Sequence, residues 1–133
     1  MVGPAGMNMF TRFILVIMLI LAAPVTSALA HSMLVKAEPP RRSVLTKSPT
    51  HVRLWFNEEI EGDYASLVVL DAQKQPITDA KPTLAPDDQK SIVLPLPELT
   101  PGKYSVKFRV LSVDGHVVES TFDFTVKGDT QRK

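Results

Sequence analysis

The sequence predicts an all-β fold, a single antiparallel Greek-key β-sandwich or barrel of the immunoglobulin-like type. Three observations lead to this prediction. Segments 104–110 and 118–126 alternate apolar and polar residues, which is typical of a sheet with one face on a core. Turn residues recur between the shorter apolar segments, and no helical period follows residue 30. We therefore expect about six or seven short strands in one domain.

The pattern of residues 1–30 is typical of a signal peptide. Arg12 precedes the apolar residues 13–21, and Ala28-Leu29-Ala30 supplies the small residues that precede a cleavage site. The apolar run is short for a membrane span, which needs about 20 residues. The expected cut follows Ala30. An uncleaved N-terminal anchor and a cut after Ala28 are the alternatives.

The folded domain is expected over residues 31–127, followed by a flexible polar tail over 128–133. The leader contains one of the 15 basic residues and none of the 14 acidic ones, so residues 31–133 have a formal net charge of zero. This balance argues against nucleic acid or an anionic membrane as the partner. The chain has no cysteine, which excludes disulfides and thiolate metal sites. We expect a monomer.

The first half of the domain contains three expected strands. Residues 33–37 form the first, which ends before Pro39 and Pro40 because proline lacks the backbone donor. In 52–56 the apolar residues at positions 52, 54 and 56 share one face. Residues 65–70 are mostly apolar and predict a more fully buried strand.

Two polar segments separate these strands from the second half. Segment 57–63 contains four acidic residues; it is interpreted as a solvated loop, with a hard-cation site as the alternative. Segment 78–89 is polar and contains two prolines, so it predicts a loop or an irregular edge.

The second half contains the clearest strands. Residues 91–94 form a strand that ends at Pro95, and 99–102 predict a tight turn with proline and glycine. The two alternating segments follow, and residues 111–117 connect them as a strand-to-strand loop.

This connecting loop contains Asp114, Gly115 and His116, a carboxylate and an imidazole on either side of a glycine. Glycine permits sharp backbone geometry there. The tripeptide alone is not specific, because an aspartate often caps its own turn. His51, at the start of a strand, is not expected to have a functional role.

Cleavage after Ala30 would make His31 the first residue of the mature chain, with a free α-amine beside its imidazole Nδ1. The α-amine has a pKa of about 7.7–8.0, so a metal displaces its proton near neutral pH. With Asp114 and His116 the set is three nitrogens and one oxygen, which favours one Cu(II) ion per chain, although Zn(II) accepts similar donors. Met33 is expected to pack within its strand.

Four segments of the mature chain resemble the CopC family of periplasmic copper-binding proteins, most closely its YobA-like members. They are His31 with the strand that leads to Glu38-Pro39, then 52–58, 99–104, and 112–116 with the closing 122–126. The resemblance rests on the common order and spacing of these four segments.

The resemblance implies a small Greek-key fold in the periplasm that binds one Cu(II) ion through His31, Asp114 and His116. It also implies a membrane copper importer of the CopD type as partner, and it places Glu58 near the copper as a weak ligand or a neighbour of the ligands. The Cu(I) site of the family uses a methionine-rich loop, but residues 63–90 contain no methionine.

Two other functions are considered. The first is a copper-dependent oxidative enzyme with an N-terminal histidine, like the lytic polysaccharide monooxygenases. The single tryptophan and two tyrosines argue against the flat aromatic face that such an enzyme uses. The second is a β-sandwich adhesion or chaperone-like module without copper. No nucleophile pattern, phosphate loop or catalytic carboxylate pair is evident, so the protein is not expected to be an enzyme.

Overall fold

The computed structural model describes residues 33–128. The predicted signal peptide, its cleavage site, His31 and most of the predicted tail lie outside these residues. Within the described part of the chain, no helix is long and apolar enough to cross a membrane.

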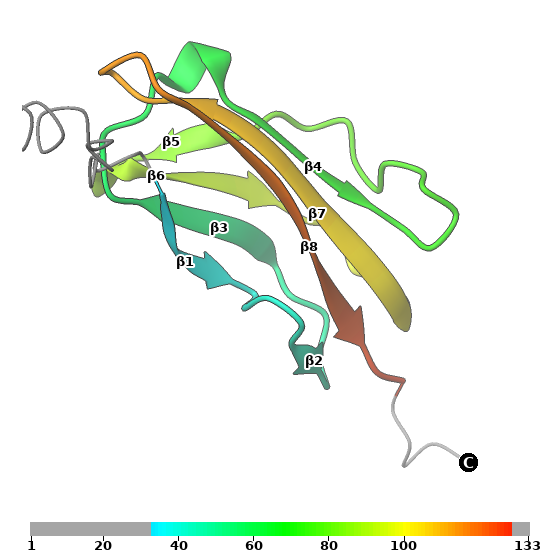
Figure 1. Ribbon diagram of the computed structural model, residues 1–133. Helices are drawn as coiled ribbons and strands as arrows, with labels where there is room; N and C mark the ends of the chain where they lie inside the picture. Colours follow the sequence, from blue (N-terminus) through cyan, green and yellow to red (C-terminus); the bar gives the residue numbers. More distant parts are fainter. Residues whose placement is uncertain (1–32, 129–133) are drawn as a thin grey trace, which may run out of the picture. The chain divides into compact units, whose positions relative to one another are not determined.

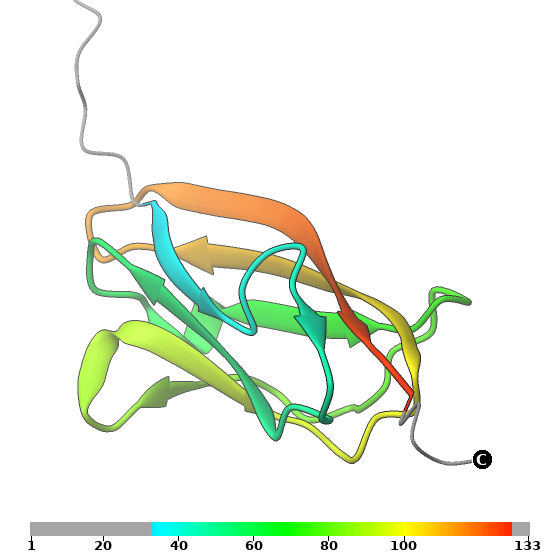
Figure 2. The same cartoon turned by 90° about the horizontal axis from the view of Figure 1, so that it is seen from below.

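Two four-stranded sheets face each other (Figures 1 and 2). The first sheet has the order β1-β3-β6-β5 and the second the order β2-β8-β7-β4. The bounds are β1 Leu34–Glu38, β2 Val44–Leu45, β3 His51–Phe56, β4 Ser66–Leu70, β5 Thr83–Ala85, β6 Asp88–Pro95, β7 Gly102–Leu111 and β8 Val117–Val126. The predicted all-β sandwich is confirmed. It is not a closed barrel, and the parallel pairing of β2 with β8 makes the second sheet mixed.

The core lies between the sheets and consists of the apolar residues that alternate along the strands. In β3, Val52, Leu54 and Phe56 are buried while the residues between them are less so, as predicted. Phe56 meets Phe108 of β7 edge to face, with ring centroids 5.7 Å apart. Tyr104 and Phe124 stack across the β7–β8 pair at 5.5 Å. These aromatic contacts join the alternating faces into one core.

The prediction of a more fully buried strand over residues 65–70 was wrong. In β4 only Leu67 and Val69 are buried, and the residues on either side of them are partly or fully exposed. The reason is that β4 pairs with β7 alone and has no sheet packed on its outer face.

The remaining differences from the predicted strands lie at sheet edges. β5 forms inside the segment predicted as a loop or irregular edge, and β6 begins three residues earlier than predicted, so that the two strands form a hairpin. β2 was not predicted; its two residues pair only with the last two residues of β8. Such short edges carry little periodic signal because they are only partly buried.

The prediction that Met33 packs within a strand was also wrong. Met33 precedes β1, and 58% of its surface is exposed. Trp55 lies on the outer face of β3, where Lys36 Nζ and the Arg53 guanidinium each lie 4.6 Å from its ring. These cation–π contacts hold the Trp55 ring against the outer face of the sheet.

Candidate metal centre

The β7–β8 loop is a compact five-residue connection. Leu111 pairs with Val117, and Ser112 closes the loop through three bonds. Its N–H donates to the His116 carbonyl at 2.8 Å, its hydroxyl accepts from the His116 N–H at 3.1 Å, and its carbonyl accepts from the Gly115 N–H at 2.9 Å. Gly115 has φ of 89°, which only glycine adopts without strain. The loop therefore holds Asp114 and His116 in a fixed turn.

The acidic segment that follows β3 is hydrogen-bonded to this loop. The Val113 N–H donates to the Glu59 carbonyl at 3.0 Å, and the Glu61 N–H donates to the Leu111 carbonyl at 2.8 Å. Between them, Ile60 forms a β-bridge with Ser112 and is buried in the core. Two segments about fifty residues apart in sequence therefore meet at one end of the sandwich.

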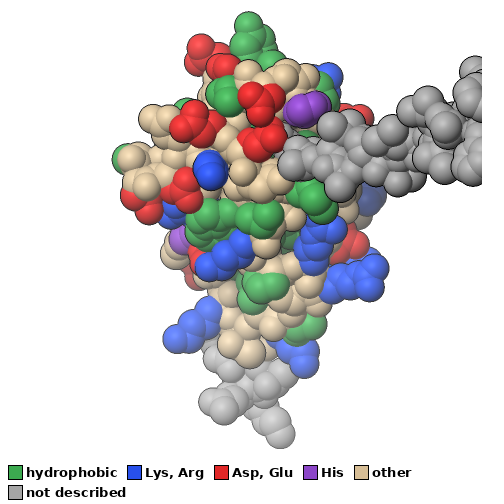
Figure 3. Space-filling view, turned by 60° about the vertical axis from the view of Figure 1, so that its left-hand side comes forward, with side chains coloured by type: hydrophobic (Ala, Val, Ile, Leu, Met, Phe, Trp, Pro, Cys, Tyr) green, Lys and Arg blue, Asp and Glu red, His purple; other side chains and the backbone are tan. Residues whose placement is uncertain are grey.

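Glu58, Asp114 and His116 form a cluster at this junction. One potential ligand atom from each side chain lies within 4.8 Å of the others. His116 Nδ1 is 3.8 Å from Glu58 Oε2, which is longer than a hydrogen bond. The Glu58 side chain is 18% exposed and that of His116 is 42% exposed, while Asp114 is exposed. Figure 3 shows acidic side chains gathered around a histidine in its upper part.

The cluster contains two of the residues that the sequence predicted as metal ligands. Asp114 and His116 lie together, and His31 lies outside the described residues. Glu58 was named only through the family resemblance. Its sequence context is an acidic loop, and nothing in that pattern distinguishes Glu58 from Glu59 or Glu61. The structure distinguishes Glu58, because the hydrogen bonds between the acidic segment and the β7–β8 loop bring its side chain next to Asp114 and His116.

Met33, the first described residue, is hydrogen-bonded at the same end of the sandwich. Its N–H donates to Asn57 Oδ1 at 2.7 Å, and its carbonyl accepts from the Asn57 N–H at 3.1 Å. Asn57 directly precedes Glu58. The backbone two residues after His31 is therefore fixed next to the segment that contains Glu58.

His51 lies at the other end of β3 from this cluster. Its Nε2 is 3.4 Å from Glu38 Oε2, and its Nδ1 is 3.1 Å from the Thr50 hydroxyl. The six residues of β3 extend over roughly 17 Å. This separation agrees with the prediction that His51 has no part in the site.

The cluster offers one imidazole and two carboxylates. Oxygen and imidazole donors suit divalent first-row metals, whereas soft thiolates are absent because the chain has no cysteine. Donors on one ion, each about 2.0–2.2 Å from it, lie about 3 Å apart when adjacent and about 4 Å apart when opposite. The observed separations are close to this range, so small side-chain rotations would bring all three donors onto one ion.

Comparison with known sequences identifies relatives of this chain. Residues 34–127 match the CopC domain. Protein YobA of Escherichia coli strain K12 is 30% identical over 102 residues, which cover 76% of this chain and 82% of that protein. The copper transport protein CutJ of Bacillus subtilis strain 168 is 25% identical over 116 residues, which cover 86% of this chain and 21% of that protein.

Solved structures with the same fold include two copper-related proteins. CopC from Methylosinus trichosporium OB3b superposes with a TM-score of 0.71 and 37% identity, over 77% of this chain and 100% of that chain. PcoC, a methionine-rich copper resistance protein from Escherichia coli, gives a TM-score of 0.64 and 28% identity, over 74% and 100%.

Proposed function

The chain belongs to the CopC family, and on this basis we propose that it is an exported copper carrier that binds one Cu(II) ion per chain. The ligands in this proposal are the α-amine and imidazole of His31, together with Asp114 and His116. The observation that carries the proposal is the cluster of Glu58, Asp114 and His116, whose donor atoms lie within 4.8 Å of one another.

The position of Met33 supports the contribution of His31. Two residues of extended chain reach about 7 Å, and Met33 is hydrogen-bonded to Asn57, the neighbour of Glu58. A chain of that length would allow His31 to reach the same end of the sandwich. Its amine and Nδ1 would form a chelate on the ion bound by Asp114 and His116.

The oxidation state follows from the chemistry of the donors. Three nitrogens and one carboxylate oxygen form a hard to intermediate set, which favours Cu(II) among divalent first-row metals. A soft site for Cu(I) needs several sulfur ligands, and residues 63–90 contain no methionine. Met33 is the one thioether of the mature chain.

In this proposal Glu58 has one of two roles. Its carboxylate is 3.8 Å from His116 Nδ1, so it either coordinates the ion weakly or orients the imidazole while Nε2 coordinates. Either role stabilises the loaded state. In both cases Glu58 adds negative charge that offsets the charge of the ion.

The test compares correctly processed protein, which begins at His31, with protein that has one extra N-terminal residue. The extra residue converts the α-amine into an amide and removes one donor. We expect Cu(II) affinity to fall by at least a hundredfold in a competition titration. Equal affinities would exclude the chelate, as would a mature N-terminus other than His31 in mass spectrometry.

In the cell, the proposal is that the protein works in the periplasm as a monomer and buffers copper or delivers it to a membrane importer of the CopD type. The match to CutJ supports this role, because a segment similar to this chain forms 21% of a longer copper transport protein.

We further propose that the bound copper does not catalyse oxidation. The two nitrogens of His31 with Asp114 and His116 provide four donors, and Glu58 lies beside them, which leaves little room for a substrate on the ion. Peroxide production with ascorbate should therefore be slower for the loaded protein than for free Cu(II). Faster production, or cleavage of a polysaccharide, would favour the monooxygenase-like alternative.

A further inference from the structure

The two hydrogen bonds between Met33 and Asn57 differ from an ordinary strand pair. In a hydrogen-bonded antiparallel pair, each residue donates its N–H to the main-chain carbonyl of the other. Here the Asn57 N–H donates to the Met33 carbonyl at 3.1 Å, but the Met33 N–H donates to the side-chain Oδ1 of Asn57 at 2.7 Å. The asparagine side chain takes the place of a backbone acceptor.

Because the Asn57 side chain accepts this bond, the backbone can leave the sheet at Asn57 while the N-terminal segment stays hydrogen-bonded. β3 ends at Phe56, and the chain then turns toward the β7–β8 loop, where the Glu59 carbonyl accepts from the Val113 N–H. A main-chain bond from Met33 would require Asn57 to continue the strand. The side chain therefore satisfies both requirements at one residue.

Asn57 consequently connects the two halves of the candidate site. Asn57 directly precedes Glu58, one member of the donor cluster. Through its side chain it holds Met33, two residues after His31. The two bonds between Met33 and Asn57 thus join the start of the described chain to the cluster segment.

We propose that Asn57 is a positioning residue for copper: its side chain holds the N-terminal segment so that His31 reaches the ion bound at Asp114 and His116. This inference rests on the proposed function. Asn57 itself does not coordinate the ion in this scheme. Its contribution is to reduce the freedom of the chain before the ion binds, which lowers the entropic cost of closing the chelate.

The first experiment compares Cu(II) affinity of mature wild-type protein with that of Asn57→Ala. Removal of a residue that supports metal ligands costs about 10–100-fold in affinity, and we expect about tenfold because Asn57 is exposed and water competes for the bond. Asn57→Asp keeps the acceptor and should stay within about threefold of wild type. Loss of affinity in both variants to the same extent would contradict the proposal.

Thr78→Ala is the matched control. Thr78 Oγ1 accepts from the Ala80 N–H at 3.1 Å, which is also an exposed bond from a backbone donor to a side-chain oxygen, but it lies in the segment between β4 and β5. Thr78→Ala should leave copper affinity unchanged. The melting temperatures of both metal-free variants should stay close to that of wild type, which separates positioning from unfolding.

A double-mutant cycle tests whether Asn57 acts through His31. Asn57→Ala is measured in the chain that starts at His31 and in the chain with one extra N-terminal residue. We expect the tenfold loss in the first background and no loss in the second, where the amine donor is already absent. An equal loss in both backgrounds would show that Asn57 only supports the fold of the acidic segment.

The same measurements distinguish failure of this inference from failure of the proposed function. If wild-type affinity does not depend on a free His31 amine, the proposed chelate is excluded. If it does depend on that amine and Asn57→Ala binds copper like wild type, only the positioning role is excluded.

Discussion

At the scale of single residues, the three histidines of the chain differ in what surrounds them. His116 lies 3.8 Å from Glu58 and near Asp114, whereas His51 lies near Glu38 at the other end of β3. His31 precedes the described residues. Residue type alone does not distinguish these imidazoles, but their neighbours do.

We predict that His116→Ala lowers Cu(II) affinity by at least a hundredfold, because the variant loses the only imidazole in the described cluster. His51→Ala serves as the control and should bind copper like wild type. Competition with a chromogenic chelator measures both. Similar affinities for the two variants would remove His116 from the ligand set.

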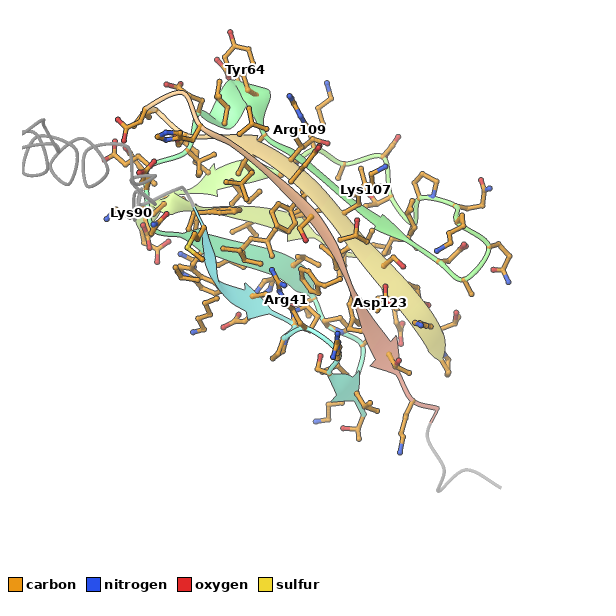
Figure 4. The ribbon with its side chains drawn as sticks, viewed as in Figure 1. Arg41, Tyr64, Lys90, Lys107, Arg109 and Asp123 are labelled. Atoms are coloured by element: carbon orange, nitrogen blue, oxygen red, sulfur yellow. The ribbon has the colours of Figure 1, made fainter. Side chains whose placement is uncertain are left out.

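A second prediction at this scale concerns Asp123 of β8, which lies away from the hairpin loop (Figure 4). The Ser105 hydroxyl donates to its carboxylate at 2.8 Å, and this bond, followed by Lys103 at 3.3 Å, holds the pKa of Asp123 below its ordinary value of 3.8. Since the pKa is lower in the folded state, the stabilisation is present above pH 3.8 and disappears as the pH falls through the folded-state value.

Asp123→Asn should therefore reduce the free energy of unfolding at neutral pH by about 0.5 kcal/mol or less, because the side chain is partly exposed. The difference from wild type should vanish in strong acid. Chemical denaturation across the acid range measures it. A difference that persists below the carboxyl range would mean that packing, not charge, stabilises Asp123.

At the scale of secondary-structure elements, the β7–β8 hairpin determines the geometry of the candidate site. Ten residue pairs align its strands, and Ser112 closes the loop through bonds to Gly115 and His116. The alternating sequence predicted this hairpin correctly. The loop is rigid because its own backbone and the acidic segment satisfy its hydrogen bonds.

We predict that Gly115→Ala destabilises the hairpin loop by about 1 kcal/mol, because alanine is strained at φ of 89°. An added Cβ would meet no atom within 4 Å, so the cost comes from the backbone and not from a clash. Thermal unfolding measures the change. Copper affinity should fall as well, since the loop carries both Asp114 and His116.

A control for this prediction is Gly115→Asn, because asparagine tolerates positive φ better than alanine. Asn should cost less stability and less affinity than Ala. If both substitutions have no effect on either measurement, the loop geometry does not control the site.

At the scale of the whole domain, acidic residues are concentrated at one end of the strands, although residues 31–133 are neutral overall. Four acidic residues of segment 58–63, with Asp87 in the β5–β6 turn and Asp88 at the start of β6, lie at the end with the cluster, as the bond from the Ile60 N–H to the Gln89 carbonyl shows. Lys103 and Lys127 lie at the opposite end, where β7 begins and β8 ends. Most Lys and Arg side chains occupy the lower part of Figure 3.

From this concentration of acidic residues we predict that this end attracts copper cations and raises their association rate. Neutralising Glu59, Glu61 and Asp63 with Gln, Gln and Asn should slow Cu(II) association several-fold at low salt and change dissociation little. Stopped-flow fluorescence of Trp55 measures both rates. The difference from wild type should decrease with ionic strength, and a difference independent of salt would exclude electrostatic attraction.

The sequence by itself determined the all-β class, the burial of β3, β7 and β8, and the presence of Asp114 and His116 in one hairpin. These features are local. Alternation along a strand shows which of its residues are buried, and a glycine in a turn shows where the backbone needs a positive φ. It also predicted the chelate at His31, which the experiments above test.

Only the tertiary structure decided where Met33 lies and how exposed β4 is, and it brings Glu58, which the sequence named only through the family resemblance, next to Asp114 and His116. Each of these depends on segments that are distant in sequence: the bonds from Val113 to Glu59 and from Met33 to Asn57, and the position of β4 at a sheet edge. Such contacts arise from the pairing of strands and the packing of the two sheets, which no single segment specifies. The concentration of acidic residues at one end of a neutral domain has the same origin.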